Sequence, residues 1–359
     1  MSAVRGEQTA DQVPVIEATN ITKTFNPRGG GVVDKGVVHA LRGVDFILRR
    51  GDAASFIGES GCGKTTLGRI LAGLETSGGG DLRLAGQDVT RVHGVARRRM
   101  FQRVQLIHQD PYSALNPTST IEETLRVPLK MRARQRGERR PGPWGRGRML
   151  ELLDLVGLDP LGVLDKYPHK LSGGQRQRVC IARALIPEPD VLVADEAVSM
   201  IDVSLRLGIL NVFKKLRSEV GVALLFITHD VATARYIGPD GTISVIYRGL
   251  VVEQGPTDKI IQRPEHPYTQ CLLSALPVMR GVETDGPDRQ LPTAGPETHQ
   301  RTDGDHECPF LRRCPVAQDA CAVGVPPLVS VAGQPSPAHL HRCRFPRARS
   351  VIPQPLGPP

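Results

Sequence analysis

The stretch GESGCGKTT, which begins at Gly58, constrains the fold of this chain more than any other feature. It directly follows the apolar run ASFI and directly precedes LGRILAGL, which has a helical pattern. The stretch matches G-x-x-x-x-G-K-[ST], a loop between a strand and a helix whose backbone N–H groups bind phosphate oxygens. A chain that carries it is expected to build an α/β sheet around a nucleotide site.

Each part of this loop has a predicted chemical task. The glycines let the backbone curl around phosphate, and the following helix adds its positive N-terminal end. Lys64 reaches the β- and γ-phosphates, and the Thr65 hydroxyl ligates Mg²⁺. The predicted nucleotide-binding residues of the loop are Gly58, Glu59, Ser60, Gly61, Cys62, Gly63, Lys64, Thr65 and Thr66.

Further apolar runs indicate the rest of the fold. DVLVAD (190–195) and ALLFIT (223–228) lack polar alternation, which is typical of parallel strands buried on both faces. Strand and helix patterns alternate, so we predict an α/β layered fold. Between Ile121 and Ala184 the pattern is mostly helical, as in RMLELLDLVGL, and we predict a helical subdomain over residues 110–187.

A pair of acidic residues follows the second apolar run. Asp195 is predicted to bind Mg²⁺, directly or through water, and Glu196 to polarise the attacking water. An acidic turn at the end of a strand is the alternative interpretation, and it is disfavoured beside a phosphate loop.

A second anion site is predicted at LSGGQRQR, residues 171–178, where Ser172 and a glycine pair open a helix. One loop already covers one face of a nucleotide, so this site is expected to grip ATP held by another subunit. The order and spacing of the phosphate loop, HQD, LSGGQ, ADE, SMID and THD resemble ABC transporter ATP-binding subunits from about residue 13 to 260.

The resemblance implies further roles. Gln109 corresponds to the glutamine that touches Mg²⁺ and relays nucleotide state to the membrane subunit, and His229 to the switch histidine that contacts the γ-phosphate. Phe25 corresponds to the aromatic that stacks on adenine, with a core aromatic at a strand end as the alternative. The residues implied to meet the opposite subunit or its ATP are Ser172, Gly173, Gly174, Gln175 and Asp202.

One departure from the family pattern lies in DEAVSMID, where the family often has DEPTSALD. The substituted positions carry no charge or hydroxyl that the chemistry uses, since Asp195, Glu196, Ser199 and Asp202 remain. We therefore expect a competent ATPase, driven by closure of an ATPase dimer, and disfavour a regulatory subunit that binds ATP without hydrolysing it.

Two segments indicate a particular branch of the ABC transporter family. QDPYSALNP (109–117) and RPEHPYTQCLLSALP (263–277) resemble the oligopeptide/dipeptide importer branch, which also includes nickel and oligosaccharide importers. This implies a related, non-identical second ATPase subunit, two membrane permease subunits and an extracytoplasmic solute-binding protein. Peptides are the expected solute, oligosaccharides the alternative, and a non-transport ABC ATPase the rival class.

Charge and hydropathy bear on location and partners. The chain has a net charge of +9, and residues 126–148 hold nine Lys or Arg against one Glu. We interpret this run as a solvated loop between helices, without nucleic-acid binding. No apolar run could span a bilayer, and MSAVRGEQTADQ lacks the apolar core of a signal peptide. The expected location is the cytoplasmic face of the cytoplasmic membrane, held there by the permease.

The C-terminal part gathers thiols. We predict a nucleotide-binding domain over residues 13–262, a loop-rich extension over 263–343 and a disordered tail over 344–359. Cys180 and Cys271 are expected to be small core residues. Cys308, Cys314, Cys321 and Cys343 are spaced C-x₅-C-x₆-C-x₂₁-C in a region poor in large apolar residues, which would gain from a cross-link.

Three interpretations of these thiols compete. A disulfide framework is disfavoured in a cytoplasmic protein. Structural Zn²⁺ usually takes closer cysteine pairs, with His306 or His341 as substitute ligands here. Four widely spaced thiolates suit a [4Fe–4S] cluster, which we favour and which the resemblance to the importer branch also implies.

Overall fold

The computed structural model describes residues 13–26, 37–275, 306–331 and 339–349, without the side chain of residue 203. The chain divides into two compact units. Unit 1 comprises the described parts of Met1–Ile21, Asp45–Ala53 and Thr65–Ile227. Unit 2 comprises those of Thr22–Val44, Ala54–Lys64 and Thr228–Pro359.

Unit 1 contains three parallel strands, β6 (Val104–Ile107), β7 (Val191–Asp195) and β8 (Ala223–Thr228, with Thr228 in unit 2). Every residue of β7 and β8 is buried, and Asp195 pairs with Ile227 at the carboxyl ends. These are the strands predicted at residues 190–195 and 223–228. Unalternating apolar runs form them because both faces of the sheet are covered.

A smaller sheet has the order β2-β1-β4-β5. It comprises β1 (Ile16–Phe25), β2 (Val38–Leu48), β4 (Gly79–Leu84) and β5 (Gln87–Asp88). The antiparallel pair β4 and β5 turns through Ala85 and Gly86, both with positive φ. Its strands alternate buried and exposed residues, as a sheet with one solvated face does.

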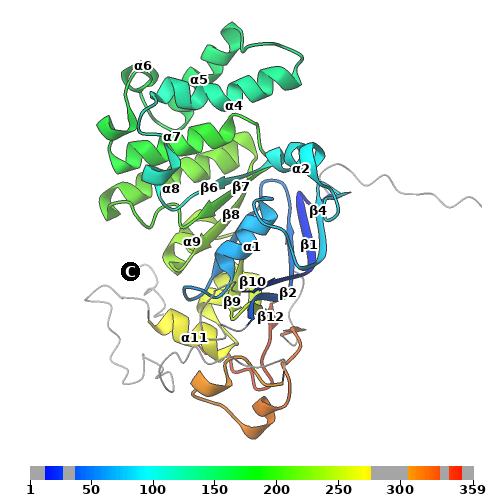
Figure 1. The fold of residues 1–359 in the computed structure, drawn as a ribbon. Coiled ribbons are helices and arrows are strands. Elements are labelled where there is room, and N and C mark those ends of the chain that lie inside the picture. Colours follow the sequence, from blue (N-terminus) through cyan, green and yellow to red (C-terminus); the bar gives the residue numbers. More distant parts are fainter. Residues whose placement is uncertain (1–12, 27–36, 276–305, 332–338, 350–359) are drawn as a thin grey trace, which may run out of the picture. The chain divides into compact units, whose positions relative to one another are not determined.

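Helices form the predicted helical region of unit 1. In Figure 1, α4, α5 and α7 lie together, and α7 contacts α4, α5, α8 and β6. The predicted helical subdomain is thus helical throughout much of its length. The helices are α1 (Lys64–Leu71), α2 (Gly94–Met100), α3 (Pro111–Ala114), α4 (Ile121–Gln135), α5 (Pro143–Leu155), α6 (Pro160–Val163), α7 (Gly173–Leu185) and α8 (Val203–Lys215), with short 3₁₀ or π turns at Phe101–Arg103, Pro168–Lys170 and Leu216–Val220.

The basic run at residues 126–148 differs from expectation. It lies mostly within α4 and α5, and only residues 136–142 connect the two helices. Acidic neighbours pair with several of its arginines: Arg126 bonds Glu122, and Arg132 bonds Glu188. The interpretation as a loop between helices was therefore wrong for most of the run, because Arg and Lys have good helix propensity when their charges are accommodated.

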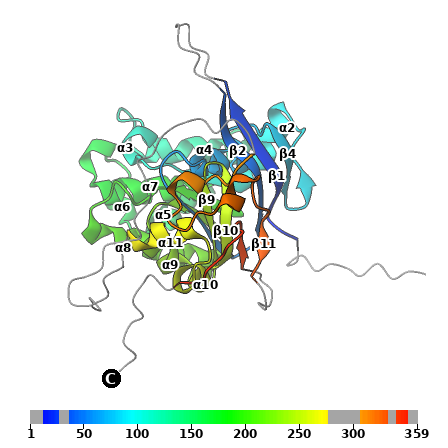
Figure 2. The ribbon, with the colours of Figure 1, turned by 90° about the horizontal axis from the view of Figure 1, so that it is seen from below.

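Unit 2 contains the remaining strands. β3 (Ala53–Ile57, with Ala53 in unit 1) pairs in parallel with β9 (Thr242–Tyr247), and β9 pairs antiparallel with β10 (Leu250–Pro256). Two short strands, β12 (Leu340–His341) and β11 (Val329–Ser330), continue the edge beyond β10. Figure 2 labels β9, β10 and β11 together with the helices of this unit, α9 (Val231–Ile237), α10 (Thr257–Gln262) and α11 (Pro267–Ser274).

The C-terminal extension packs into unit 2. The buried core there includes Tyr247, Tyr268, Cys271 and Phe310, with Cys308 and Cys314 packed against it. Short 3₁₀ turns at Leu311–Arg313 and Asp319–Ala322 order the cysteine segment. The predicted boundary at residue 262 falls inside this unit, and the predicted domain limits stay a prediction.

Residues 344–349 are ordered by hydrogen bonds, contrary to the expected disordered tail. The Arg347 and Arg349 N–H groups donate to the carbonyls of Glu265 and Pro264, and the Gln270 side chain donates to the Arg347 carbonyl. These backbone partners satisfy a segment whose composition alone indicated disorder. Residues 350–359 lie outside the described residues.

Candidate functional site

The phosphate loop depends on glycine at two positions. Gly58 has φ +152° and Gly63 has φ +109°, values that L side chains rarely adopt. A Cβ at Gly58 would collide with the Ile246 carbonyl, and one at Gly63 with the Ala40 carbonyl. Any side chain at either position would displace the loop that the sequence predicts to hold phosphate.

Lys64 is folded over its own loop. Its side chain is buried, and Nζ donates to the carbonyl oxygens of Gly58 at 2.7 Å and Glu59 at 2.8 Å. The Cys62 thiol lies 3.6 Å from the same ammonium, and burial raises the pKa of that thiol. The ammonium is thus held at the loop by neutral carbonyls, which a triphosphate would replace as partners.

Two residues predicted to bind Mg²⁺ meet in unit 1. The Thr65 hydroxyl, in the first turn of α1, donates to Asp195 Oδ1 at 3.1 Å. Asp195 ends the buried strand β7 and is itself 9% exposed. A hydroxyl and a carboxylate oxygen at hydrogen-bond distance are suited to Mg²⁺, which prefers oxygen ligands.

Glu196 and Gln109 are also brought together. Gln109 Nε2 donates to Glu196 Oε2 at 3.1 Å, although 87 residues separate them. Glu196 has φ +46°, and its N–H donates to the Ile227 carbonyl at 2.9 Å. Ser199 Oγ donates to the Glu196 carbonyl at 2.8 Å, so the retained serine of the SMID loop has a structural role.

The LSGGQ segment forms the start of α7 by a capping box. Ser172 Oγ accepts from the Gln175 N–H at 3.2 Å, and Gln175 Oε1 accepts from the Ser172 N–H at 3.0 Å. Gly174 is buried, and a Cβ there would lie 3.5 Å from Leu205 of α8. The two polar side chains predicted to reach a nucleotide therefore each accept a hydrogen bond from the other residue's backbone N–H.

The remaining predicted residues lie at element ends. His229 is exposed directly after β8, and Asp202 is exposed at the start of α8 without a capping bond from its side chain. Phe25 ends β1 and is 40% exposed, with Lys23 Nζ 5.1 Å from its ring centre. That exposure is inconsistent with the alternative of a core aromatic. Ser60, Gly61 and Thr66 lie at the exposed or half-buried surface of the loop.

Comparison with known proteins identifies the family. Residues 41–199 match the family described as ABC transporter, and residues 252–321 match the oligopeptide/dipeptide transporter C-terminal region. The dipeptide transport ATP-binding protein DppF of Escherichia coli K12 is 37% identical over 323 residues, covering 90% of this chain and 93% of that protein. The chain belongs to the ATP-binding proteins of ABC transporters.

Other relatives agree with this family. The di/tripeptide transport ATP-binding protein DppF of Pseudomonas aeruginosa is 38% identical, covering 88% of this ABC protein and 94% of that one. Among solved structures, the ATP-binding cassette MJ0796, a dimer bound to ADP and Pi, has a TM-score of 0.59 at 28% identity, covering 67% and 98% of the two chains. The predicted α/β ABC fold with an appended C-terminal region and the predicted ATPase class are both confirmed.

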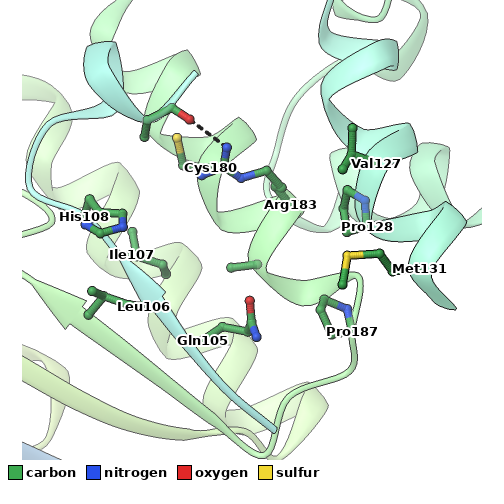
Figure 3. A pocket seen from close by; sticks show the side chains of 12 residues that line it. Gln105, Leu106, Ile107, His108, Val127, Pro128, Met131, Cys180, Arg183 and Pro187 are labelled. Carbon is green, nitrogen blue, oxygen red and sulfur yellow. Dashed lines mark hydrogen bonds between the residues drawn. The ribbon is translucent and has the colours of Figure 1, made fainter. Parts of the chain in front are cut away.

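The ABC protein has a cavity of about 200 Å³ in unit 1, shown in Figure 3. Gln105 and His108 line it from β6 and the segment that follows, and Val127 and Met131 line it from α4. Arg183 of α7 and Ala114 also line it, and Arg183 Nη1 donates to the Ala114 carbonyl at 2.7 Å. Burial lowers the pKa of His108, and the neighbouring Arg183 charge lowers it further.

The four C-terminal thiols line a second cavity, in unit 2. Cys308, Cys314, Cys321 and Cys343 all contribute to it, with Phe310 and Phe345 among the apolar neighbours. Burial raises the pKa of the Cys308 and Cys314 thiols, and that of Cys343 to about 11. Cys308 and Cys343, which are distant in the sequence, thus line one cavity, and their role as metal ligands stays a prediction. Cys180 and Cys271 are buried in α7 and α11, as predicted.

Two residues that contact the phosphate loop were missed by sequence reasoning. Tyr268 accepts a hydrogen bond from the Glu59 N–H, and Arg313 bonds the Glu59 carboxylate. Tyr268 lies in the HPYTQ segment that the sequence singled out, but nothing in the pattern linked it to the loop. Arg313 has no sequence signal, because its partner is 254 residues away.

Two kinds of feature are absent from the described part of the chain. No helix there is long and apolar enough to cross a membrane. No group of three or more His, Cys, Asp or Glu side chains there could hold a metal ion, and this includes the four C-terminal cysteines. The predicted [4Fe–4S] cluster and the Zn²⁺ alternative both stay predictions.

Proposed function

We propose that this chain is the ATP-hydrolysing subunit of an importer for peptides. The observation that carries the proposal is the match of residues 252–321 to the oligopeptide/dipeptide transporter C-terminal region. This chain aligns with more than nine tenths of the length of two relatives that are named for dipeptide and di/tripeptide transport. Their names support peptides as the solute. Oligosaccharides are the alternative solute.

The proposed ATP site uses the residues of the phosphate loop, 58–66. Lys64 exchanges its carbonyl partners for the β- and γ-phosphates, and Phe25 stacks on adenine. Thr65 and Asp195, which already meet through one hydrogen bond, hold Mg²⁺ with Gln109. Mg²⁺ would supply charge neutralisation at the β- and γ-phosphate oxygens.

Hydrolysis is proposed to use Glu196 as the general base. Its carboxylate takes a proton from water as the water oxygen bonds the γ-phosphorus and the bond to the β–γ bridging oxygen breaks. His229 orients the water and the γ-phosphate. The hydrogen bond from Gln109 to Glu196 gives a route by which loss of the γ-phosphate reaches the Gln109 segment.

A second ATPase subunit completes each site. Ser172, Gly173, Gly174 and Gln175 contact ATP held by the partner, and Asp202 crosses the same interface. The exposure of Ser172, which caps α7, and that of Asp202, whose side chain makes no capping bond to α8, support this role. Release of Ser172 and Gln175 from their capping box is then part of dimer closure, and the partner is a related, non-identical chain.

Two membrane permease subunits are the proposed anchor of the chain at the cytoplasmic face of the membrane. The cavity of Figure 3, lined by the exposed Val127 and Met131 of α4, suits an apolar helix end of a permease. An extracytoplasmic solute-binding protein would deliver the peptide, and nucleic acid has no part in the proposal.

Reconstituted transport tests the solute. The complete complex is placed in proteoliposomes with ATP inside the vesicle at the cytoplasmic face, and uptake of labelled di- and tripeptides is compared with uptake of oligosaccharides. ATP-dependent peptide uptake, absent in a complex with Glu196→Gln, is expected. Oligosaccharide uptake without peptide uptake would overturn the solute, and co-purification with ribosomes or DNA instead of permeases would overturn the transport role.

The four-thiol cavity is proposed to hold a [4Fe–4S] cluster. Its thiols all face one apolar space, and Cys₄ is the usual ligand set of such a cluster. The raised thiol pKa values mean that thiolates there need a cation partner. The cluster would cross-link the loop-rich extension. Anaerobic purification should give a brown protein with about four irons per chain, and a colourless, iron-free protein would contradict this.

A further inference from the structure

The C-terminal extension grips the side chain of Glu59, the second residue of the phosphate loop. Arg313 Nη1 donates to Glu59 Oε2 at 2.8 Å, and Nη2 donates to Oε1 at 2.9 Å. The two side chains are 12% and 28% exposed. A parallel pair of charge-assisted bonds fixes both position and orientation, which a single contact would not do. The hydrogen bonds to Glu59 also raise the pKa of the Arg313 guanidinium.

The extension holds the backbone of Glu59 as well. The Glu59 N–H donates to Tyr268 Oη at 2.9 Å, and Tyr268 is only 1% exposed. Rings of Tyr247 and Phe310 pack on Tyr268, with centroids 4.5 Å and 5.4 Å away. Tyr268 is thus a rigid support that comes from α11, while Phe310 comes from the cysteine segment.

Glu59 transmits this grip to Lys64. The Glu59 carbonyl accepts from Lys64 Nζ at 2.8 Å, so one residue joins the extension to the phosphate-binding ammonium. Arg313 also places a positive charge against the Glu59 carboxylate, in a loop predicted to receive a polyanion. Loss of Arg313 is therefore expected to weaken nucleotide binding both through loop order and through charge repulsion.

The turn that presents Arg313 is the turn that gathers the thiols. Arg313 directly precedes Cys314, in the 3₁₀ turn Leu311–Arg313. The Leu311 N–H donates to the Cys308 carbonyl at 3.0 Å, and the Cys308 N–H donates to the Cys321 carbonyl at 2.9 Å. The backbone that carries the Arg313 guanidinium therefore belongs to the same hydrogen-bonded segment as Cys308 and Cys314.

We propose that Arg313 and Tyr268 are positioning residues that hold the phosphate loop ready for ATP, and that the four-thiol segment thereby sets the ATP affinity of the chain. The inference goes beyond the proposed import function, since it concerns nucleotide binding whatever the solute. The proposal does not depend on which metal or cross-link joins the four thiols.

We call the contacts of Arg313 and Tyr268 with Glu59 the clamp. Equilibrium binding of a fluorescent ATP analogue to the purified full chain tests it. Arg313→Gln is expected to weaken binding about tenfold, since a bond to a charged group contributes about 1.5 kcal/mol. In the assembled ATPase the change should appear in KM, with kcat at saturating ATP largely kept. Arg312→Gln is the matched control, because it removes the same charge one residue away, where the partner is Glu307 at 3.6 Å.

Charge and position are separated by a double-mutant cycle. Glu59→Gln removes the repelling carboxylate, so Glu59→Gln/Arg313→Gln should bind the analogue more tightly than Arg313→Gln alone. Tyr268→Phe, which keeps the ring packing, should weaken binding by itself. Equal affinity for Arg313→Gln and Arg312→Gln, with unfolding temperatures showing both chains folded, would overturn the clamp.

A separate experiment tests whether the four-thiol segment affects ATP affinity. Cys314→Ser should weaken analogue binding, and combining it with Arg313→Gln should add little, because both changes break one path. Cys180→Ser is the control for loss of a thiol outside the segment. Unchanged affinity in Cys314→Ser, or full additivity with Arg313→Gln, would refute the role of the thiol segment in ATP affinity. Weaker binding by Arg313→Gln would still support the role of Arg313 itself.

Discussion

Glu196 combines a strained backbone with the proposed catalytic carboxylate. Its φ of +46° is uncommon for a side chain as long as glutamate. Hydrogen bonds from its N–H to Ile227 and to its carbonyl from Ser199 hold that conformation. Strain of this kind collects at functional sites, where surrounding bonds impose one direction on a side chain.

Glu196→Gln should lower kcat for ATP hydrolysis about 10²- to 10⁴-fold, because an amide cannot accept the proton from water. The amide oxygen can still accept from Gln109, so the site should stay folded and bind ATP. Phosphate release and retained nucleotide are measured on the assembled complex. Turnover near that of the unchanged protein would remove Glu196 as the base.

Cys180, buried in α7, predicts an alkaline dependence of stability. Burial raises its pKa from 9.0 to about 11, so the folded state favours the neutral thiol. That contribution is complete below pH 9 and is lost as pH rises toward 11. We expect the free energy of unfolding to fall by of order 2 kcal/mol over this range from this group.

Cys180→Ala should lack that part of the alkaline loss. Chemical denaturation of both chains across the range measures it, and groups other than Cys180 titrate alike in the two. Parallel losses in both chains would contradict the assignment to Cys180.

Two helices of unit 1 begin with the same device, and only one of them lies in the proposed ATP interface. Thr120 and Glu123 cap α4 reciprocally, as Ser172 and Gln175 cap α7. Comparing the two caps separates the effect of a capping residue on stability from its effect on ATP hydrolysis.

Ser172→Ala and Thr120→Ala should each destabilise the chain by about 1 kcal/mol, as the loss of a capping hydroxyl does. Only Ser172→Ala is expected to lower ATP hydrolysis by the assembled dimer beyond what the loss of folded protein explains. Unfolding midpoints and ATPase rates are compared for the two variants. An equal ATPase defect in both would show that the Ser172 hydroxyl acts through α7 stability alone.

At the scale of the whole molecule, ATP hydrolysis must reach a permease through a surface of unit 1. The cavity of Figure 3 is the proposed surface, and exposed Val127 of α4 lines it. Val95 of α2 is another exposed helical valine, and it does not line this cavity.

Val127→Asp should therefore abolish co-purification with the permeases and reduce uptake, because it places a charge where an apolar helix end is expected. Val95→Asp is the matched control and should leave both unchanged. ATP-analogue binding by the isolated chain should be the same for the two variants. Loss of assembly in both, or in neither, would place the permease elsewhere.

Much of the nucleotide chemistry was predictable, because short motifs carry it. The strand–loop–helix at residues 54–71, the acidic pair after β7 and the cap at Ser172 are local patterns, and each forms where the sequence indicated. Buried parallel strands were predictable for the same reason, since their apolar runs do not alternate. The basic run was misjudged as a loop because its arginines are helical, with local partners such as Glu122 of Arg126 and distant ones such as Glu188 of Arg132.

The sequence by itself indicated the ABC family and the local motifs of the candidate nucleotide site, and it singled out four C-terminal thiols. Only the tertiary structure decided that Gln109 meets Glu196 and that Arg313 and Tyr268 hold Glu59, because these contacts join residues that no periodicity connects. Local propensity and motif spacing act over a few residues. Contacts across 87, 209 and 254 positions arise only when the chain folds around a shared core.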